Sequence, residues 1–328
     1  MKIAAYVSGL LGLALLIALV ISTDFTGMVQ TMERGGWKLF LLIPYRAPFF
    51  LLYAIGWLYL LRPYDSERHA GLGYLFWVTA VRDSIDRLLP VASVGGGVAA
   101  VRLLCWRGLA AAPVGATVVV EILLTLSVSY LFTAMGLLLL SGFNGTGPEY
   151  RRLLIAFLVT LPVPAVTALL LRYGSVFKRL QKFFRPLVGA TALSEGAAAL
   201  DRELLACFRR RRTLLLAGTL QFAALISGSF EIWFALRLFG HPVGANTALV
   251  LESMTQAIRL LAFVIPAGLG VQEAGLVLFG HTLGINGELA LAVSMTKRAR
   301  EVLCGLPSLL SWQWVEGQRL QMLKGKAA

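Results

Sequence analysis

Charged residues are scarce in this chain. Asp, Glu, Lys and Arg together make up 14% of the 328 residues, whereas 58% are hydrophobic. Soluble domains carry about 25% charged and roughly 45–50% apolar residues. A soluble chain could not bury this much apolar surface, and the mean hydropathy of +0.76 points the same way. The composition therefore excludes a soluble enzyme, a disulfide-rich module and a disordered tail, and it predicts that most of the chain lies in a bilayer.

Cysteine and histidine are also rare. The three cysteines, Cys105, Cys207 and Cys304, are odd in number and far apart, so they imply no disulfide framework. The three histidines show no metal-ligand spacing, and neither a nucleophile elbow nor a phosphate-binding glycine loop occurs. We therefore predict no catalytic residue, no metal, no cofactor and no enzymatic activity.

Acidic residues are outnumbered, and the formal net charge is +13. The basic residues lie mostly between apolar runs, a pattern that reports membrane topology rather than nucleic-acid binding. Residues 172–212 hold ten basic residues against three acids. We expect this segment and both termini on the cytoplasmic side, and we expect no nucleic-acid partner.

Long apolar runs are abundant, and a run of about 20 residues can cross a bilayer as a helix. We predict about six full spans in an all-α polytopic membrane protein that forms one integral-membrane domain over residues 1–328. The spans are residues 3–21, 39–61, 114–140, 153–171 with a kink at Pro162 and Pro164, 213–238 and 289–315.

Two further apolar segments, 70–106 and 245–280, must each begin and end on one side of the membrane in this topology. Each is broken by proline and glycine, so we predict two re-entrant hairpins, although full spans remain an alternative. Paired interruptions of this kind are typical of inverted-repeat transporters, with halves here at 39–171 and 213–315 joined by the basic segment 172–212. Chance similarity between glycine-rich segments is the other explanation. The predicted hinge residues are Pro90, Gly95, Gly96, Pro266, Gly268 and Gly270.

Several charged residues fall at membrane depth, where each costs at least about 2.5–3.5 kcal/mol unless it pairs or lines water. Helical spacing predicts that Arg82 pairs with Asp86, Asp83 with Arg87, and Lys297 with Glu301. These pairs could line a cavity or simply hold the broken helices together.

A polar stripe forms on one helix face, because Glu252, Gln256 and Arg259 are spaced at i, i+4 and i+7. Such a stripe on an apolar helix predicts a cavity. Glu121 and Glu231 are lone acids that could carry protons or pair with Arg102 and Arg46. Arg46 itself we interpret as a structural or snorkelling group.

Three motifs resemble those of a hopanoid-biosynthesis-associated membrane protein family, within the larger group that shares the transmembrane domain of lysylphosphatidylglycerol synthases. They are Leu-Leu-Pro-Val-Ala-Ser-Val-Gly-Gly (88–96) with Val-Arg-Leu-Leu (101–104), then Glu-Ser-x-x-Gln-Ala-Ile-Arg (252–259) with Pro266 and Gly-Val-Gln-Glu (270–273), then Lys-Arg-Ala-Arg-Glu (297–301) with Gly-Leu-Pro (305–307) and Trp-Gln (312–313). One position departs from the family pattern, because Gly97 stands where we expect an acid. We expect no aminoacyl-transferase domain after residue 315 and therefore no lysyl transfer.

The resemblance implies a lipid-handling protein of the bacterial inner membrane that moves hopanoids toward the outer membrane. Its partners would be membrane lipids of the hopanoid or phospholipid type; partner transport proteins cannot be named from the sequence. We predict that the polar head group contacts Glu252, Gln256, Arg259, Gln272, Glu273, Arg87 and Arg102, with Arg82, Asp83, Asp86, Lys297, Arg300 and Glu301 as structural or cavity-lining charges. Two alternatives stay open: an ion-coupled transporter of a small solute, and a membrane-embedded lipid-modifying enzyme.

Overall fold

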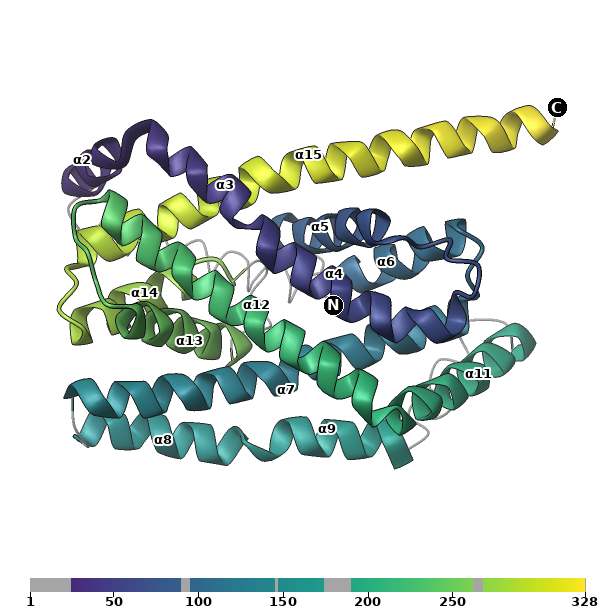
Figure 1. Ribbon diagram of the computed structural model, residues 1–328, viewed down its shortest axis with the longest axis horizontal. Coiled ribbons are helices and arrows are strands. Elements are labelled where there is room, and N and C mark those ends of the chain that lie inside the picture. The colour runs from purple at the N-terminus through teal and green to yellow at the C-terminus, as the bar shows by residue number, and fades with distance from the viewer. Residues whose placement is uncertain (1–24, 90–94, 145–146, 174–189, 262–267, 328) are drawn as a thin grey trace.

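The chain is helical in the computed structural model, which describes residues 25–89, 95–144, 147–173, 190–261 and 268–327. These residues contain no strand, which confirms the predicted all-α class (Figure 1). The helices are α2 (Phe25–Gly35), η1 (Gly36–Leu41), α3 (Leu42–Tyr45), α4 (Ala47–Leu61), η2 (Arg62–Tyr64), α5 (Leu72–Leu88), α6 (Gly95–Trp106), α7 (Ala111–Asn144), α8 (Pro148–Thr160), α9 (Pro162–Tyr173), α11 (Ala190–Arg209), α12 (Arg211–Leu238), α13 (Ala245–Leu261), α14 (Val271–Thr282) and α15 (Gly287–Ala327).

Four helical stretches in the described part of the chain are long and apolar enough to cross a membrane. They are Thr26–Tyr64, Ala111–Gly142, Tyr150–Tyr173 and Arg211–Leu238. Each contains one of the predicted spans. The predicted span 289–315 lies within the continuous helix α15, which is not among these four, and the predicted span 3–21 lies outside the described residues. The protein is a multi-pass membrane protein.

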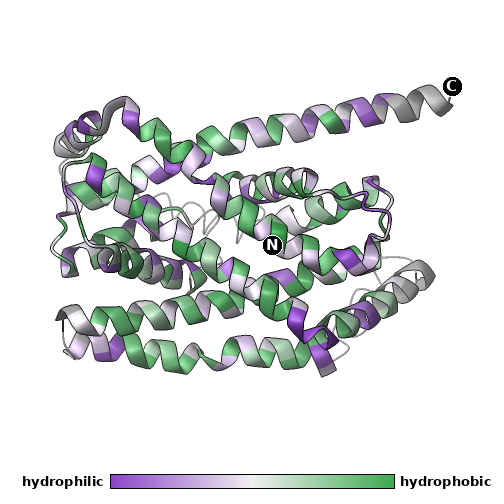
Figure 2. Cartoon of the chain, viewed as in Figure 1, coloured by the Kyte–Doolittle hydropathy of each residue, from purple (hydrophilic) through white to green (hydrophobic). Residues whose placement is uncertain are grey.

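The predicted kink near Pro162 separates α8 from α9, because a proline inside a helix removes a backbone donor. These two helices run end to end beside α7 (Figure 1). They are strongly apolar (Figure 2). Only 6% of the most hydrophobic window of Tyr150–Tyr173 is buried inside the protein. Their outer surface is therefore suited to contact lipid.

Each segment predicted as a re-entrant hairpin contains two helices that pack together, and their re-entrance stays a prediction. Helix α5 packs against α6, and α13 packs against α14. Gly95 begins α6, while Gly268 and Gly270 precede α14 with φ angles of +59° and +73°, values that favour glycine. The predicted hinge residues Pro90 and Pro266 lie outside the described residues.

The packing of the two hairpins is reciprocal. Helix α4 packs along α12 in the middle of the molecule, α5 packs on α15, and α13 packs on α7. Each hairpin thus contacts a long helix from the other part of the chain. This arrangement brings the charged faces of α5, α13 and α15 to one place.

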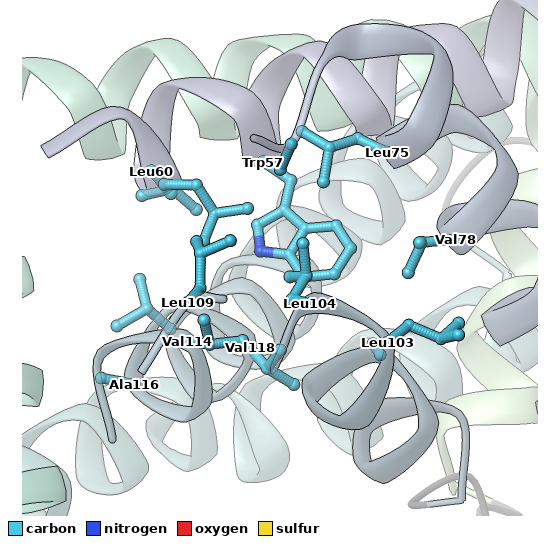
Figure 3. Close-up of a cluster of buried hydrophobic side chains, with 14 of the residues drawn as sticks. Trp57, Leu60, Leu75, Val78, Leu103, Leu104, Leu109, Val114, Ala116 and Val118 are labelled. Carbon is cyan, nitrogen blue, oxygen red and sulfur yellow. The ribbon is translucent and has the colours of Figure 1, made fainter. Parts of the chain in front are cut away.

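An apolar cluster around Trp57 holds the first hairpin against α4 and α7 (Figure 3). Trp57 is 1% exposed, and its indole nitrogen donates a hydrogen bond of 3.2 Å to Thr117 Oγ1 on α7. Leu75 on α5 and Leu103 on α6 are fully buried in the same cluster. The backbone of the first hairpin is therefore fixed by packing as well as by charge.

Candidate functional site

A polar cavity of about 190 Å³ lies between the hairpins and the central helices, which is room for several water molecules. We call it the central cavity. Basic residues outnumber acidic ones among its described lining residues. These are Arg46, Phe49, Phe50, Tyr53, Thr79, Arg82, Asp83, Asp86, Arg87, Glu121, Thr125, Leu225, Glu252, Gln256, Arg259, Lys297, Arg300 and Glu301.

The predicted pair within α5 is confirmed, and α15 extends it. Arg87 Nε lies 2.8 Å from Asp83 Oδ1, and Arg87 Nη1 lies 2.5 Å from Glu301 Oε1. Glu301 also accepts a hydrogen bond from Arg298 Nη1 at 3.2 Å. Glu301 therefore joins the first hairpin to α15, a contact between residues 214 positions apart.

The predicted pair of Arg82 with Asp86 is wrong. Arg82 instead pairs with Glu121 on α7, and Asp86 Oδ1 accepts the backbone N–H of Gly96 at 3.0 Å. Asp86 thus satisfies an N–H in the first turn of α6, where a carboxylate is favoured. These partners, on α7 and α6, cannot be predicted from the spacing of charges within α5.

The predicted pair of Lys297 with Glu301 is also wrong, although both residues line the cavity. Lys297 Nζ lies 2.6 Å from Glu252 Oε2, so it ties α15 to the second hairpin. Arg300 Nε lies 2.5 Å from Glu231 Oε1 on α12. Glu121 and Glu231 are therefore paired, with Arg82 and Arg300 rather than with Arg102 and Arg46.

Two predicted head-group contacts, Gln272 and Glu273, lie outside the central cavity. Both are at most 1% exposed, and they sit in the first turn of α14. Glu273 Oε1 lies 3.0 Å from Arg298 Nε, and Arg298 Nη2 donates to the Gly268 carbonyl at 3.0 Å. Glu273 and Arg298 therefore hold the start of α14 against α15, behind the cavity wall.

Arg259 lies in the cavity as predicted. Its Nη1 atom lies 3.5 Å from Gln272 Oε1, and its side chain rests against Gly268. Among the residues that the structure describes, no carboxylate lies within 4.0 Å of its guanidinium group. It is a cation that lines the cavity without an ion-pair partner in the described chain.

Arg46, directly before α4, also lines the cavity, whereas its place in the sequence indicated a structural or snorkelling group. It is 6% exposed, its guanidinium carbon lies 3.5 Å from the centre of the Phe49 ring, and its closest carboxylate oxygen is Asp83 Oδ1 at 3.9 Å. Its Nε atom has no hydrogen-bond partner in the part of the chain that the structure describes. An arginine that interrupts an apolar span was the available signal.

Arg102 is not brought to the cavity, contrary to the prediction. Its side chain is 56% exposed, and it pairs with Glu316 near the end of α15 while lying over the Trp106 ring. Gly97, where the family resemblance leads us to expect an acid, also faces elsewhere. A Cβ added there would lie 3.3 Å from Val118 on α7, so a side chain at this position would enter the packing between α6 and α7.

An apolar groove lies on the other side of α13, between α8 and the second hairpin. It joins two spaces of about 80 and 620 Å³ that share Leu153, Ala156 and Phe279. Helix α13 contributes Ala257, Ile258 and Leu260 to this groove, whereas its Gln256 and Arg259 line the central cavity. One helix therefore separates a polar space from an apolar one.

In the described part of the chain, His, Cys, Asp and Glu form no group of three that could hold a metal ion. In this all-helical membrane protein, the two hairpins and the central helices thus surround a charged cavity. More specifically, the chain belongs to the family described as the lysylphosphatidylglycerol synthase TM region, whose family model matches residues 6–307. This membership suggests a function connected with membrane lipids. Searches of curated proteins and of solved structures gave no match.

Proposed function

We propose that this protein moves an amphipathic lipid between the leaflets of a bacterial inner membrane. Hopanoid-type lipids, the class that the sequence resemblance implies, and phospholipids are the two candidate substrates. The observation that carries the proposal is the division of space around α13, with the central cavity on one side and the apolar groove on the other.

A lipid crosses a bilayer slowly because its polar head must leave water and enter hydrocarbon, which costs several kcal/mol without compensating hydrogen bonds. The central cavity offers such bonds through Gln256 and Arg259. The groove, lined by Ile258 and Phe279 among others, would keep the apolar body out of water. The protein would thus lower the barrier by keeping each part of the lipid in a medium that suits it.

Access from each leaflet in turn would come from relative movement of the two hairpin-containing parts. Rocking of one part of a transporter against the other around a central site is the usual mechanism in inverted-repeat architectures. The reciprocal packing of α5 on α15 and of α13 on α7 is compatible with such a movement. We therefore propose that the central cavity opens alternately to the two sides.

The test is lipid exchange in vesicles that contain the purified full chain. A fluorescent lipid, of hopanoid or phospholipid type, is placed in both leaflets, and a membrane-impermeant reductant bleaches the outer one. Faster loss of the remaining fluorescence than in protein-free vesicles is the expected result. If no lipid tested loses this fluorescence faster with the protein than in protein-free vesicles, the proposal is overturned.

A matched pair of variants on α8 ties the exchange to the groove. Ala156→Trp places a bulky ring in the groove, because Ala156 lines both of its parts. Val159→Trp adds the same ring at a position that is 72% exposed. We expect the first variant to slow exchange several-fold and the second to leave it unchanged; equal rates in the two would exclude the groove as the path.

A further inference from the structure

Two arginines of the central cavity lack the partners that the other described cavity cations have. Arg82, Arg87, Lys297 and Arg300 each have a carboxylate oxygen within 2.8 Å. Arg259 has none within 4.0 Å in the part of the chain that the structure describes, and Arg46 has only the 3.9 Å contact with Asp83. The hydroxyl of Thr79, 7% exposed, also lines the cavity and has no hydrogen-bond partner among the described residues.

The carboxylates near these arginines are already engaged. Asp83 lies 2.8 Å from Arg87, Glu252 lies 2.6 Å from Lys297, and Glu301 contacts Arg87 and Arg298. Arg46 is 6% exposed and Arg259 is half-buried, and a cation that is removed from water without a close anion is costly in a low-dielectric interior. The cavity is therefore built to receive a negative charge that the described side chains do not supply.

We propose that the central cavity binds the phosphate of an anionic membrane lipid, held by Arg259 and Arg46. The planar guanidinium group presents paired donors that match phosphate oxygens, and such charge-assisted bonds are stronger than neutral ones. The Thr79 hydroxyl supplies one further hydrogen-bonding group. The inference rests on the proposed lipid function and narrows its substrate class to lipids that carry a phosphate.

A lipid, rather than a free anion, is favoured by what adjoins the site. Ile258, the neighbour of Arg259 on α13, lines the apolar groove. The apolar body of a lipid whose phosphate binds Arg259 would therefore lie in the groove, along the neighbouring face of α13. Inorganic phosphate shares the head-group chemistry but would leave the groove unused.

The test compares phosphatidic acid with diacylglycerol of the same acyl chains, which differ only in the phosphate. Binding of each to the purified full chain in neutral detergent is measured by native mass spectrometry, and inorganic phosphate is added as a competitor. We expect the wild-type protein to bind phosphatidic acid at least tenfold more tightly than diacylglycerol. Millimolar phosphate should compete weakly, because it lacks the apolar body.

Substitution identifies the site. Arg259→Gln and Arg46→Gln should each weaken phosphatidic acid binding about tenfold, equivalent to about 1.4 kcal/mol. Arg259→Lys should retain part of the affinity because it keeps the charge. Arg102→Gln, which removes an arginine outside the cavity, should have no effect. Elution of each variant as a single species in gel filtration shows that it remains folded.

Three results would overturn the inference. Equal affinities for the two lipids would show that phosphate is not recognised. Unchanged phosphatidic acid binding in both Arg→Gln variants would place the phosphate elsewhere. Arg259-dependent binding of inorganic phosphate without lipid binding would show a free-anion site. The proposed function is tested separately, since lipid exchange faster than in protein-free vesicles, together with equal binding of phosphatidic acid and diacylglycerol, would support translocation while contradicting this specificity.

Discussion

The two hairpins have the same order of parts but use their charges differently. In the first, Arg82, Asp83 and Arg87 on α5 all find oppositely charged partners, and Asp86 accepts the Gly96 N–H. In the second, Glu252 is tied to Lys297, whereas Arg259 faces the cavity without a carboxylate partner in the described chain. The charges of the first hairpin therefore hold helices together, whereas the second hairpin offers a ligand the Arg259 guanidinium, which has no carboxylate partner in the described chain.

A charge at membrane depth does not by itself mark a binding residue. Charges that pair across helices stabilise the arrangement of those helices, and replacing one partner leaves the other uncompensated. A charge that lines a cavity without a partner is the better candidate for contact with substrate. Variants of Glu301, Gly96, Arg259 and Arg102 test whether the two hairpins differ in this way.

The largest effect is expected at Glu301, which joins the first hairpin to α15. Glu301→Gln would remove one of two close carboxylates from Arg87 and from Arg298, which keep Asp83 and Glu273, and breaking a buried pair costs up to about 3–5 kcal/mol. Thermal unfolding of the detergent-solubilised protein should show a melting temperature that is lower by roughly 5–10 °C. Glu288→Gln, in the first turn of the same helix, is the control, and an equal effect there would contradict the prediction.

A smaller effect is expected from packing within the hairpins. A Cβ at Gly96 would lie 2.6 Å from the Arg82 carbonyl oxygen, so Gly96→Ala should destabilise the protein by about 1–3 kcal/mol. A Cβ at Gly275 on α14 would meet its neighbours no closer than 3.4 Å. Gly275→Ala should therefore be neutral or stabilising, because alanine favours helix by up to about 1 kcal/mol.

The same unfolding measurement, made on both alanine variants, tests this contrast. If Gly96→Ala destabilises the protein no more than Gly275→Ala does, then α5 and α6 do not approach each other closely at Gly96.

The next prediction concerns Arg259. Since its charge has no ion-pair partner in the described structure, Arg259→Gln should leave the melting temperature unchanged or raise it by the equivalent of about 1 kcal/mol. The unfolding curve is recorded without added lipid. A fall as large as that of Glu301→Gln would show that Arg259 stabilises the fold, which would remove the distinction between the two hairpins.

The smallest effect is expected at the exposed pair of Arg102 and Glu316. Exposed ion pairs contribute roughly 0.2–1 kcal/mol, and salt screens them. Arg102→Gln should shift the melting temperature by no more than about 2 °C at low salt, and the shift should vanish at high salt. A large, salt-resistant shift would indicate that this contact is more buried than its 56% exposure implies.

Several features of the fold were predictable because they depend on residues close together in the chain. Apolar runs of about 20 residues predicted the stretches that contain α4, α7, α8–α9 and α12, and Pro162 predicted the break before α9. Proline and glycine predicted both hairpins. The spacing of Glu252, Gln256 and Arg259 predicted the helix face that lines the cavity. Asp83 and Arg87 pair as predicted because a helix brings positions i and i+4 together.

The partners of the remaining charges depend on tertiary packing. Arg82 and Lys297 each have a candidate partner one turn away, yet they pair with Glu121 and Glu252, 39 and 45 residues distant in the sequence. Similarly, Gln272 and Glu273 lie behind the cavity wall and Arg102 lies outside it, although all three occur in the motifs that carry the family resemblance. Arg46, in contrast, lines the cavity, although its only signal in the sequence was a charge within an apolar span.

Local sequence thus determined where helices form and break in this protein, because backbone hydrogen bonding and apolar length act over a few turns. Which charges stay unpaired was decided by tertiary structure. An ion pair needs its two groups within about 4 Å, and between helices only their packing sets that distance. The unpaired Arg259, on which the proposed phosphate site depends, could be recognised only after every nearby described carboxylate had been assigned its partner.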